Sequence, residues 1–278
     1  MHIGVATFLT DRSITVSEIA REAEARGFDS FWAPEHTHIP KSRRSPWPGG
    51  ADLPERYWRT LDPFVALAAA AMVTQRIRLG FGICLIIERD PITTAKAVAS
   101  LDFVSGGRVD FGVGGGWNKE EMADHGTDPR LRWRLMRERV LAMKEIWTRD
   151  EPEFHGELVD FEPMWSWPKP LQRPLPIWVG GNVDNTLKRA IEWGEGWMPN
   201  YGRSDILSQL PLFRRMCEEA GRGHLPVMVF GARLDQDELN RFREAGIDQI
   251  AFWIPSDGRE AALRRLDDLT PVRESLAA

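Results

Sequence analysis

The stretch IRLGFGICLIIERDPITTAKAVASLDFVSGGRVDFGVGGG, residues 77–116, decides the fold of this chain. Two runs rich in β-branched and aromatic residues, Ile77–Ile83 and Arg108–Val113, predict strands on either side of a helix over Ile92–Val104. A strand, a helix and a second strand in this order are typical of the βαβ unit of a parallel sheet. The stretch therefore predicts an α/β fold.

The same alternation continues along the chain in both directions. We expect further strands at His2–Phe8, Phe28–Ala33, Leu175–Val179, Gly196–Pro199, Pro226–Phe230 and Gln249–Ile254. We expect further helices at Val16–Arg26, Pro63–Thr74, Leu131–Thr148, Asn185–Trp193, Asp205–Ala220, Asp237–Ala245 and Arg259–Leu266. Eight such pairs in 278 residues match the usual size of a (β/α)8 barrel of the TIM type. The prediction is one barrel domain over residues 1–278.

Two segments are too long to be simple connections. Pro34–Leu61 follows the second strand, and Arg149–Arg173 is an insertion before the fifth strand. Loops of this length inside a compact domain usually bind a ligand or cover a site. The first lies on the catalytic face of a barrel, because it follows a strand. Within the second, Phe154–Gly156 and Val159–Phe161 predict a small hairpin.

The composition excludes several classes of protein. Hydrophobic residues make up 42% and charged residues 28% of the chain, which is typical of a folded domain. The net charge is −5 without a polybasic block, so nucleic acid is not an expected partner. We see no apolar run of the roughly 18 to 20 residues that a membrane span needs. With two cysteines, Cys84 and Cys217, and no visible signal peptide, we expect a cytoplasmic protein without a disulfide framework.

Glu35 and His36 follow the second strand, where a barrel carries its catalytic groups. An imidazole can exchange a proton near neutral pH, and a carboxylate beside it can orient it or pair with its charge. The alternative is a loop histidine bonded to the backbone. His38 adds a second imidazole, but without a third ligand at motif spacing we expect no metal.

Glycines dominate the end of the fourth strand, Gly112–Gly116, and Asn118 follows them closely. Without side chains, this backbone can approach a flat ring or a polar chain. The run is not the dinucleotide-binding fingerprint, because Trp117 stands at the position of its last glycine. A tight structural turn is the alternative.

A second glycine pair, Gly180-Gly181, ends the fifth strand and precedes Asn182 and a predicted helix. Free backbone N–H groups and the positive end of a helix dipole make such a turn a phosphate site. An ordinary turn capped by Asn182 or Asp184 is the alternative.

Together these three segments resemble the bacterial luciferase-like monooxygenase superfamily, and in particular its oxidoreductases that use coenzyme F420. The resemblance covers about residues 1–199, and the last third agrees mainly in its strand–helix rhythm. Its most specific motifs are Leu79–Ile83, Asp90-Pro91, Ala95-Lys96, Leu101-Asp102, Ser105–Arg108, Gly112–Gly114, Trp117-Asn118 with Glu121, Val179–Gly181 and Gly194–Trp197.

The resemblance implies a site for each part of the cofactor. The ring would lie across the barrel mouth, against Ala6, Gly82, Ile83 and Gly114, with a non-prolyl cis peptide at Gly82–Ile83. Asn118 would contact the polar chain, while Gly180, Gly181 and Asn182 would hold the phosphate. His36 would stand beside the reacting carbon, with Glu35 as its catalytic neighbour.

One departure from the family concerns the substrate. Relatives that oxidise sugar phosphates carry a glutamate soon after the Gly-x-Gly of the fourth strand, where this chain has Gly115. The missing acid argues against the same substrate. Glu120 and Glu121 lie further along, and we do not assign the role to them.

We therefore expect hydride transfer between coenzyme F420 and a small organic substrate, with His36 moving the proton. One alternative is a monooxygenase that receives reduced FMN from a separate reductase, and another is a flavin-binding barrel without turnover. A homodimer is expected from the resemblance. Cations in the first long loop, namely Lys41, Arg43, Arg44 and Arg56, are candidates to bind the anionic tail of F420.

Overall fold

Eight parallel strands form the centre of the computed structural model, which describes residues 1–50 and 52–277. They are β1 (His2–Ala6), β2 (Ser30–Ala33), β3 (Arg78–Phe81), β4 (Val109–Val113), β7 (Ile177–Gly180), β8 (Gly196–Met198), β9 (Met228–Ala232) and β10 (Gln249–Trp253). Their order in the sheet is β8-β7-β4-β3-β2-β1-β10-β9, and bridges at Trp197–Val227 and Asn200–Phe230 join the two outermost strands. The sheet is therefore a nearly closed barrel, which confirms the predicted fold class.

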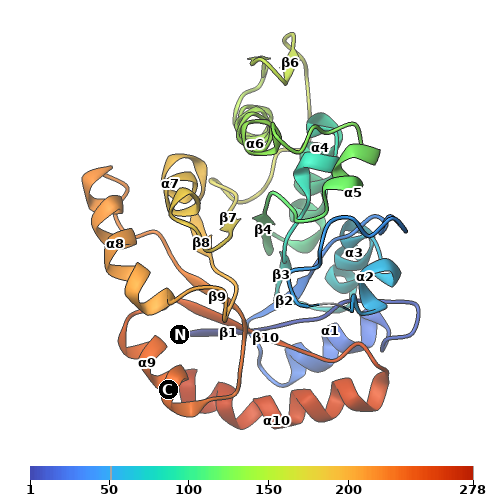
Figure 1. Cartoon of the computed structure of the whole chain (residues 1–278), viewed down its shortest axis with the longest axis vertical. Helices are drawn as coiled ribbons and strands as arrows, with labels where there is room; N and C mark the ends of the chain where they lie inside the picture. Colours follow the sequence, from blue (N-terminus) through green and yellow to red (C-terminus); the bar gives the residue numbers. More distant parts are fainter. Residues whose placement is uncertain (51, 278) are drawn as a thin grey trace.

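Helices surround this barrel (Figure 1). The longer ones are α1 (Val16–Ala25), α3 (Pro63–Val73), α4 (Pro91–Ser105), α6 (Arg132–Thr148), α7 (Asp184–Trp193), α8 (Ile206–Glu219), α9 (Gln236–Glu244) and α10 (Arg259–Ala277). The short ones are α2 (Arg56–Arg59), α5 (Lys119–Asp124) and the 3-10 turn η1 (Ile86–Glu88). No helix in the described ranges is long and apolar enough to cross a membrane.

The sequence explains where these elements begin. All five residues of β4 are buried, because helices cover the outside of the barrel and side chains fill its inside. Asp62 and Asp90 each cap a helix whose first residue is proline, a position where the missing N–H costs nothing. These caps fix the points at which α3 and α4 leave the loops of the catalytic face.

The structure differs from the sequence prediction in three elements and in the length of a fourth. Helices α2 and α5 and the turn η1 lie in loops after strands and were not predicted. Each has fewer than seven residues, which is too short to show a helical periodicity in the sequence. Helix α10 passes through Pro271 and continues to Ala277, although we expected it to end at Leu266. The predicted hairpin is present as β5 (Phe154–His155) and β6 (Asp160–Phe161), which project beyond α6 in Figure 1.

Candidate active site

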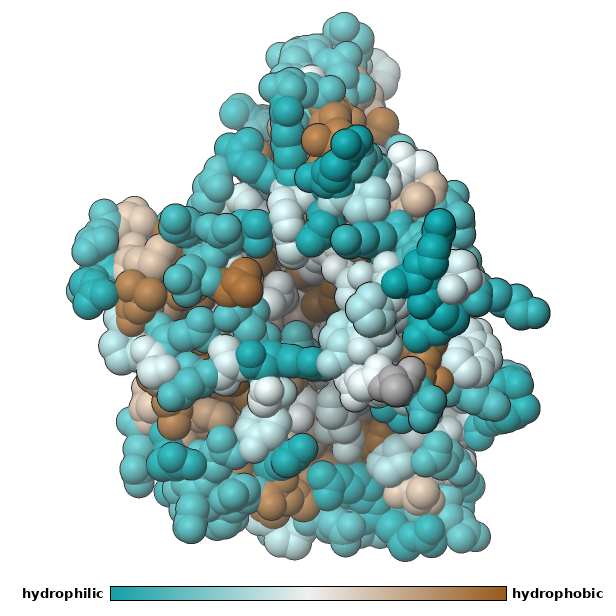
Figure 2. Space-filling model, in the orientation of Figure 1, coloured by the Kyte–Doolittle hydropathy of each residue, from teal (hydrophilic) through white to brown (hydrophobic). Residues whose placement is uncertain are grey.

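The carboxyl ends of the barrel strands surround a cavity of about 330 Å³, which lies in the range of small-molecule sites. Figure 2 shows this face hollowed near its centre, with hydrophobic side chains at the bottom of the hollow. Predicted site residues on the wall are Glu35, His36, Gly82, Ile83, Gly114, Gly180 and Gly181. The structure thus brings residues from the loops after β2, β3, β4 and β7 to one place.

Aromatic rings form much of the remaining wall, namely Phe8, Trp47, Tyr57, Trp117, Trp133, Phe230 and Trp253. Phe8 and Trp253 stack with ring centroids 5.4 Å apart and planes at 14°. Planar surfaces of this kind suit a flat, conjugated ligand.

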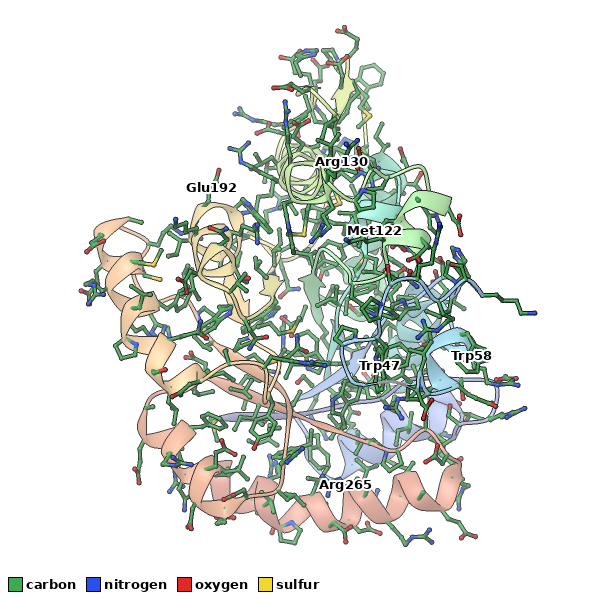
Figure 3. The ribbon with its side chains drawn as sticks, viewed as in Figure 1. Trp47, Trp58, Met122, Arg130, Glu192 and Arg265 are labelled. Atoms are coloured by element: carbon green, nitrogen blue, oxygen red, sulfur yellow. The ribbon has the colours of Figure 1, made fainter. Side chains whose placement is uncertain are left out.

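The long loop after β2 covers one side of the cavity. Within its described residues, Trp47 comes from the middle of the loop and Tyr57 from α2, whereas Trp58 lies further from the cavity (Figure 3). An arginine of the loop after β8, Arg203, donates to the carbonyl oxygen of Pro48 over 2.6 Å. This contact joins two loops at the mouth of the cavity.

Ile83 projects between two glycines of the wall. A Cβ atom on Gly114 would lie 2.5 Å from Ile83 Cδ1, and one on Gly180 would lie 3.0 Å from Ile83 Cγ2. Both positions therefore need glycine to make room for this side chain. The non-prolyl cis peptide that we predicted is present at Gly82–Ile83.

His36 is 9% exposed and makes one hydrogen bond through each ring nitrogen. Its Nδ1 lies 2.7 Å from Glu121 Oε2, and its Nε2 lies 3.2 Å from the indole nitrogen of Trp117. An indole N–H can only donate, so Nε2 accepts and Nδ1 carries the proton that it donates to Glu121. The network thus assigns a neutral imidazole with its lone pair at Nε2.

Glu121 is the functional candidate to which we assigned no role from the sequence. Its side chain is 1% exposed, and its Oε1 accepts the backbone N–H of Thr37 over 3.1 Å. Trp117 and Glu121 are four residues apart across the start of α5, so both reach the same imidazole. The spacing can be read from the sequence, but after the glycines we expected a polar loop and not a helix.

Glu35 is buried on the same wall, but its carboxylate is engaged elsewhere. It accepts the N–H of Leu85 over 2.6 Å and pairs with the guanidinium of Arg89, which also binds Asp62. Glu35 therefore holds the loop after β3. The geometry favours this positioning role over the catalytic role that we predicted.

Glu88 is a third buried carboxyl group near Glu35 and Glu121. Burial first, and then repulsion from Glu121 and Glu35, raise its pKa to about 9, against the opposing effect of Arg89. Its Oε2 has no hydrogen-bond partner among the described residues and lies 4.0 Å from His125 Nε2. Glu88 is therefore protonated at neutral pH.

Three predicted cofactor contacts have other surroundings. Ala6 is fully buried in an apolar cluster with Trp32 and Phe230, so it lies beneath the cavity surface. Asn118 caps α5, because its Oδ1 accepts the N–H of Glu121 over 3.3 Å. In the turn after β7, Asn182 donates to Asn200 O over 2.9 Å and accepts its N–H over 3.0 Å. The amide of Asn182 is thus occupied at both ends, and that of Asn118 at its oxygen.

The turn between β7 and α7 keeps free donors. Gly181 has φ +136°, which a residue with a side chain rarely adopts. The N-cap of α7 is Val183, and no side chain caps the helix. The predicted alternative, a cap from Asn182 or Asp184, is therefore not what the structure has. The Thr186 N–H donates to Val183 O over 2.7 Å and the Gly181 N–H to Met198 O over 3.2 Å. The backbone N–H groups of residues 182–185 have no partner in the described chain and remain open to an anion.

Comparisons with known proteins agree with this geometry. A family model described as luciferase-like monooxygenase matches residues 11–267. An uncharacterized protein of Mycobacterium tuberculosis is 42% identical over 283 residues, covering 100% of this chain and 98% of the relative. An F420-dependent glucose-6-phosphate dehydrogenase of Kineococcus radiotolerans is 28% identical over 254 residues, covering 86% of this chain and 68% of the relative.

Solved structures with this fold include a monooxygenase and an F420-dependent dehydrogenase. The monooxygenase RslO1 of Streptomyces bottropensis superposes with a TM-score of 0.81 at 20% identity, covering 100% of both chains. An F420-dependent secondary alcohol dehydrogenase with an F420-acetone adduct gives a TM-score of 0.77 at 19% identity, covering 99% of this chain and 98% of the other. At these identities the likeness concerns the fold.

Proposed function

The chain belongs to the luciferase-like monooxygenase family, and from this premise we propose that it transfers a hydride between coenzyme F420 and a small organic substrate. Members of the family are F420- or flavin-dependent oxidoreductases, and relatives named for F420 are among its matches. The observation that carries the proposal is the His36–Glu121 pair, which stands on the wall of a cavity lined by aromatic rings.

The residues present fit a deazaflavin. The aromatic wall and Ile83 offer surfaces for its ring, and the open donors at the start of α7 offer a site for its phosphate. When bound, F420 supplies two-electron hydride chemistry at a ring carbon. The chain's own residues need to orient the ring, exclude water and move one proton.

Proton movement is assigned to His36 Nε2. Its lone pair accepts the proton of a substrate hydroxyl group, and Glu121 stabilises the resulting imidazolium through Nδ1. The Thr37 N–H holds Glu121 in place for this task. Trp117 occupies Nε2 in the absence of substrate, so the substrate hydroxyl group must displace its indole N–H. In the reverse direction the same nitrogen returns the proton.

The second candidate is a monooxygenase that receives reduced FMN from a separate reductase. It is favoured by the fold likeness to RslO1 and by a cavity that suits the ring and first phosphate shared by FMN and F420. A flavin-binding barrel without turnover is the third candidate. It would not require the His36–Glu121 pair, which therefore argues for an enzyme.

Binding and turnover separate these candidates. Purified protein is titrated with F420 and with FMN while the absorbance of each cofactor is followed. It is then mixed with oxidised F420 and a panel of small alcohols. We expect F420 to bind at least about tenfold more tightly, a difference of about 1.4 kcal/mol, and an alcohol to bleach its absorbance. Tighter FMN binding together with oxygen consumption would favour the monooxygenase.

We also propose that the protein is a homodimer. Neighbouring helices expose apolar side chains, with Val65 71% and Met72 72% exposed on α3 and Phe103 54% exposed on α4. Such a face is typical of a surface that another chain covers. Light scattering on the wild type and on Val65→Lys/Met72→Lys measures this directly, and a monomeric wild type would contradict it.

A further inference from the structure

Two guanidinium groups flank one aromatic ring at the rim of the cavity. The guanidinium carbon of Arg189, on α7, lies 4.0 Å from the ring centroid of Trp133, and that of Arg132 lies 4.9 Å from it. Trp133 is part of the cavity wall. The pair therefore stands where α6 and α7 adjoin the site (Figure 1).

Neither arginine has an acidic partner within 4.0 Å among the residues that the structure describes. Arg132 donates to the carbonyl oxygen of Pro129 over 2.6 Å, and its buried Nε has no partner in the described chain. Burial, and then the charge of Arg132, lower the pKa of Arg189. Two like charges held together without a counter-ion are unfavourable unless an anion joins them.

Two nearby arginines are neutralised by carboxylates of the protein. Arg137 pairs with Glu192 over 2.6 Å, and Arg149, at the end of the helix, pairs with Glu145 over 3.2 Å. Figure 3 labels Glu192 on α7, away from the cavity.

Arg139 on α6 is also half-buried without a carboxylate within 4.0 Å in the described chain, and it donates to Ile86 O over 2.6 Å. Arg132 and Arg189 differ from it because both contact one ring of the cavity wall.

The position of Trp133 depends on Gly115. A Cβ atom on Gly115 would lie 2.3 Å from the Trp133 ring, so this ring fills the space that a side chain at position 115 would take. The ring can lie beside the arginines only because position 115 has no side chain. Helix α7 links the pair to the Gly180-Gly181 turn at its start.

We propose that Arg132, Trp133 and Arg189 form an anion subsite for the charged tail that F420 carries beyond its first phosphate. The inference rests on the proposed function, which places the first phosphate at the start of α7. Carboxylates of the tail would supply the missing counter-charges, and the planar guanidinium groups suit them. FMN ends at its phosphate, so it would use the subsite little.

Of the loop cations that we considered from the sequence, only Arg44 has a carboxylate partner in the described chain, Glu120 over 3.4 Å. Arg43 and Arg56 each lie over a ring, at 5.9 and 5.5 Å, and Lys41 and Arg43 are exposed. Arg132 and Arg189 are half-buried and share one ring of the cavity wall, so we assign the tail to this pair.

The test compares Arg132→Gln/Arg189→Gln with the wild type in binding three probes: F420, FMN, and the deazaflavin that lacks the phosphate and tail. We expect the Kd for F420 to rise about 10- to 100-fold, the range for losing charge-assisted hydrogen bonds. The Kd for the two other probes should stay within about threefold of the wild-type value. Arg137→Gln/Arg149→Gln removes the same charge from outside the site and should leave all three unchanged.

Each other outcome overturns a different statement. If wild-type protein does not bind F420, the proposed function fails. If F420 binds equally well to the wild type and the double variant, the subsite fails while the proposed function stands. An equal loss for F420 and FMN would assign the pair to the first phosphate and overturn the tail assignment. Should the glutamine variant not fold, Arg132→Ala and Arg189→Ala are measured singly, and an F420 affinity unchanged in both overturns the subsite.

Discussion

Two neighbouring walls of the cavity carry different ionisable groups. On the side of β2 to β4, the carboxyl groups of Glu35, Glu88 and Glu121 are buried around His36. On the side of β7, open backbone N–H groups adjoin the Arg132–Arg189 pair. One wall is thus equipped to hold and move a proton, and the other to bind an anion. A cofactor with a reactive ring at one end and a charged tail at the other matches this polarity.

The His36–Glu121 pair and the groups proposed to bind the anion differ in how far the protein satisfies their polar atoms. Glu121 accepts hydrogen bonds at both oxygens, and His36 bonds at both nitrogens. In contrast, α7 has no side-chain cap and Arg132 Nε has no partner in the described chain. Preorganised groups suit catalysis, whereas open donors suit a ligand that completes them.

Replacing the imidazole is expected to have the largest effect. His36→Ala should lower turnover by about 10²- to 10⁴-fold, the range for losing an acid–base group, because no other group in the described wall takes its place. F420 affinity should stay within about threefold, since cofactor binding is assigned to other residues of the cavity. Steady-state kinetics and a cofactor titration measure both, and unchanged turnover would remove His36 from the mechanism.

Removing the charge behind the imidazole is expected to have a smaller effect. Glu121→Gln keeps an acceptor for His36 but loses the negative charge that stabilises the imidazolium, so turnover should fall about 10- to 100-fold. Glu120→Gln is the matched control, because its carboxylate binds the Ser45 N–H and Arg44 instead. If both variants lose turnover equally, Glu121 has no specific role, and the contrast between the walls weakens.

The sequence predicted much of the barrel and part of this contrast. Hydrophobic alternation is repeated in every strand–helix unit, so the strands and most helices were predicted. The glycine segments could be predicted as ligand contacts, because a backbone without side chains can approach a ligand closely. Glu121 received no role, because its contact with His36 spans 85 positions and depends on the short helix α5. Long-range pairing of this kind leaves no local pattern.

Arg132 and Arg189 show the same limit on the other wall. In the sequence, Arg132 is one of several cations of α6, and nothing local separates it from Arg137. Which arginine meets a carboxylate is decided by the neighbouring helix. We proposed the loop cations for the tail because their loop follows a strand and lies on the catalytic face. The sequence does not show the contacts of these side chains either.

A negative charge on the anion-binding wall should weaken cofactor binding. Gly181→Asp brings a carboxylate to the turn, but any side chain here lies about 2.7 Å from Thr186 Oγ1 at an unfavourable φ. Gly181→Asn shares this strain and shape without the charge. We expect the Kd for F420 to be about tenfold higher for Asp than for Asn, and the difference to fade with salt. Equal affinities in a titration of both variants would move the phosphate away from this turn.

The smallest effect on turnover and binding is expected from Glu88, whose titration changes the stability of the folded protein instead. The pKa of Glu88 is raised from 4.5 to about 9 in the folded protein, so between these values the folded state holds a proton that the unfolded state has released. Stability therefore falls as the pH rises through this window. Glu88→Gln removes the titration, so the melting temperature of the variant minus that of the wild type should rise by roughly 5–10 °C between pH 6 and pH 9. Glu120→Gln is again the control. Burial opposes the shift there, but hydrogen bonds from Ser45 lower the pKa of Glu120, so its difference from the wild type should be flat over this range. A flat difference for Glu88→Gln as well would mean that Glu88 is ionised in the folded protein, and the wall would then carry one more negative charge than its geometry indicates.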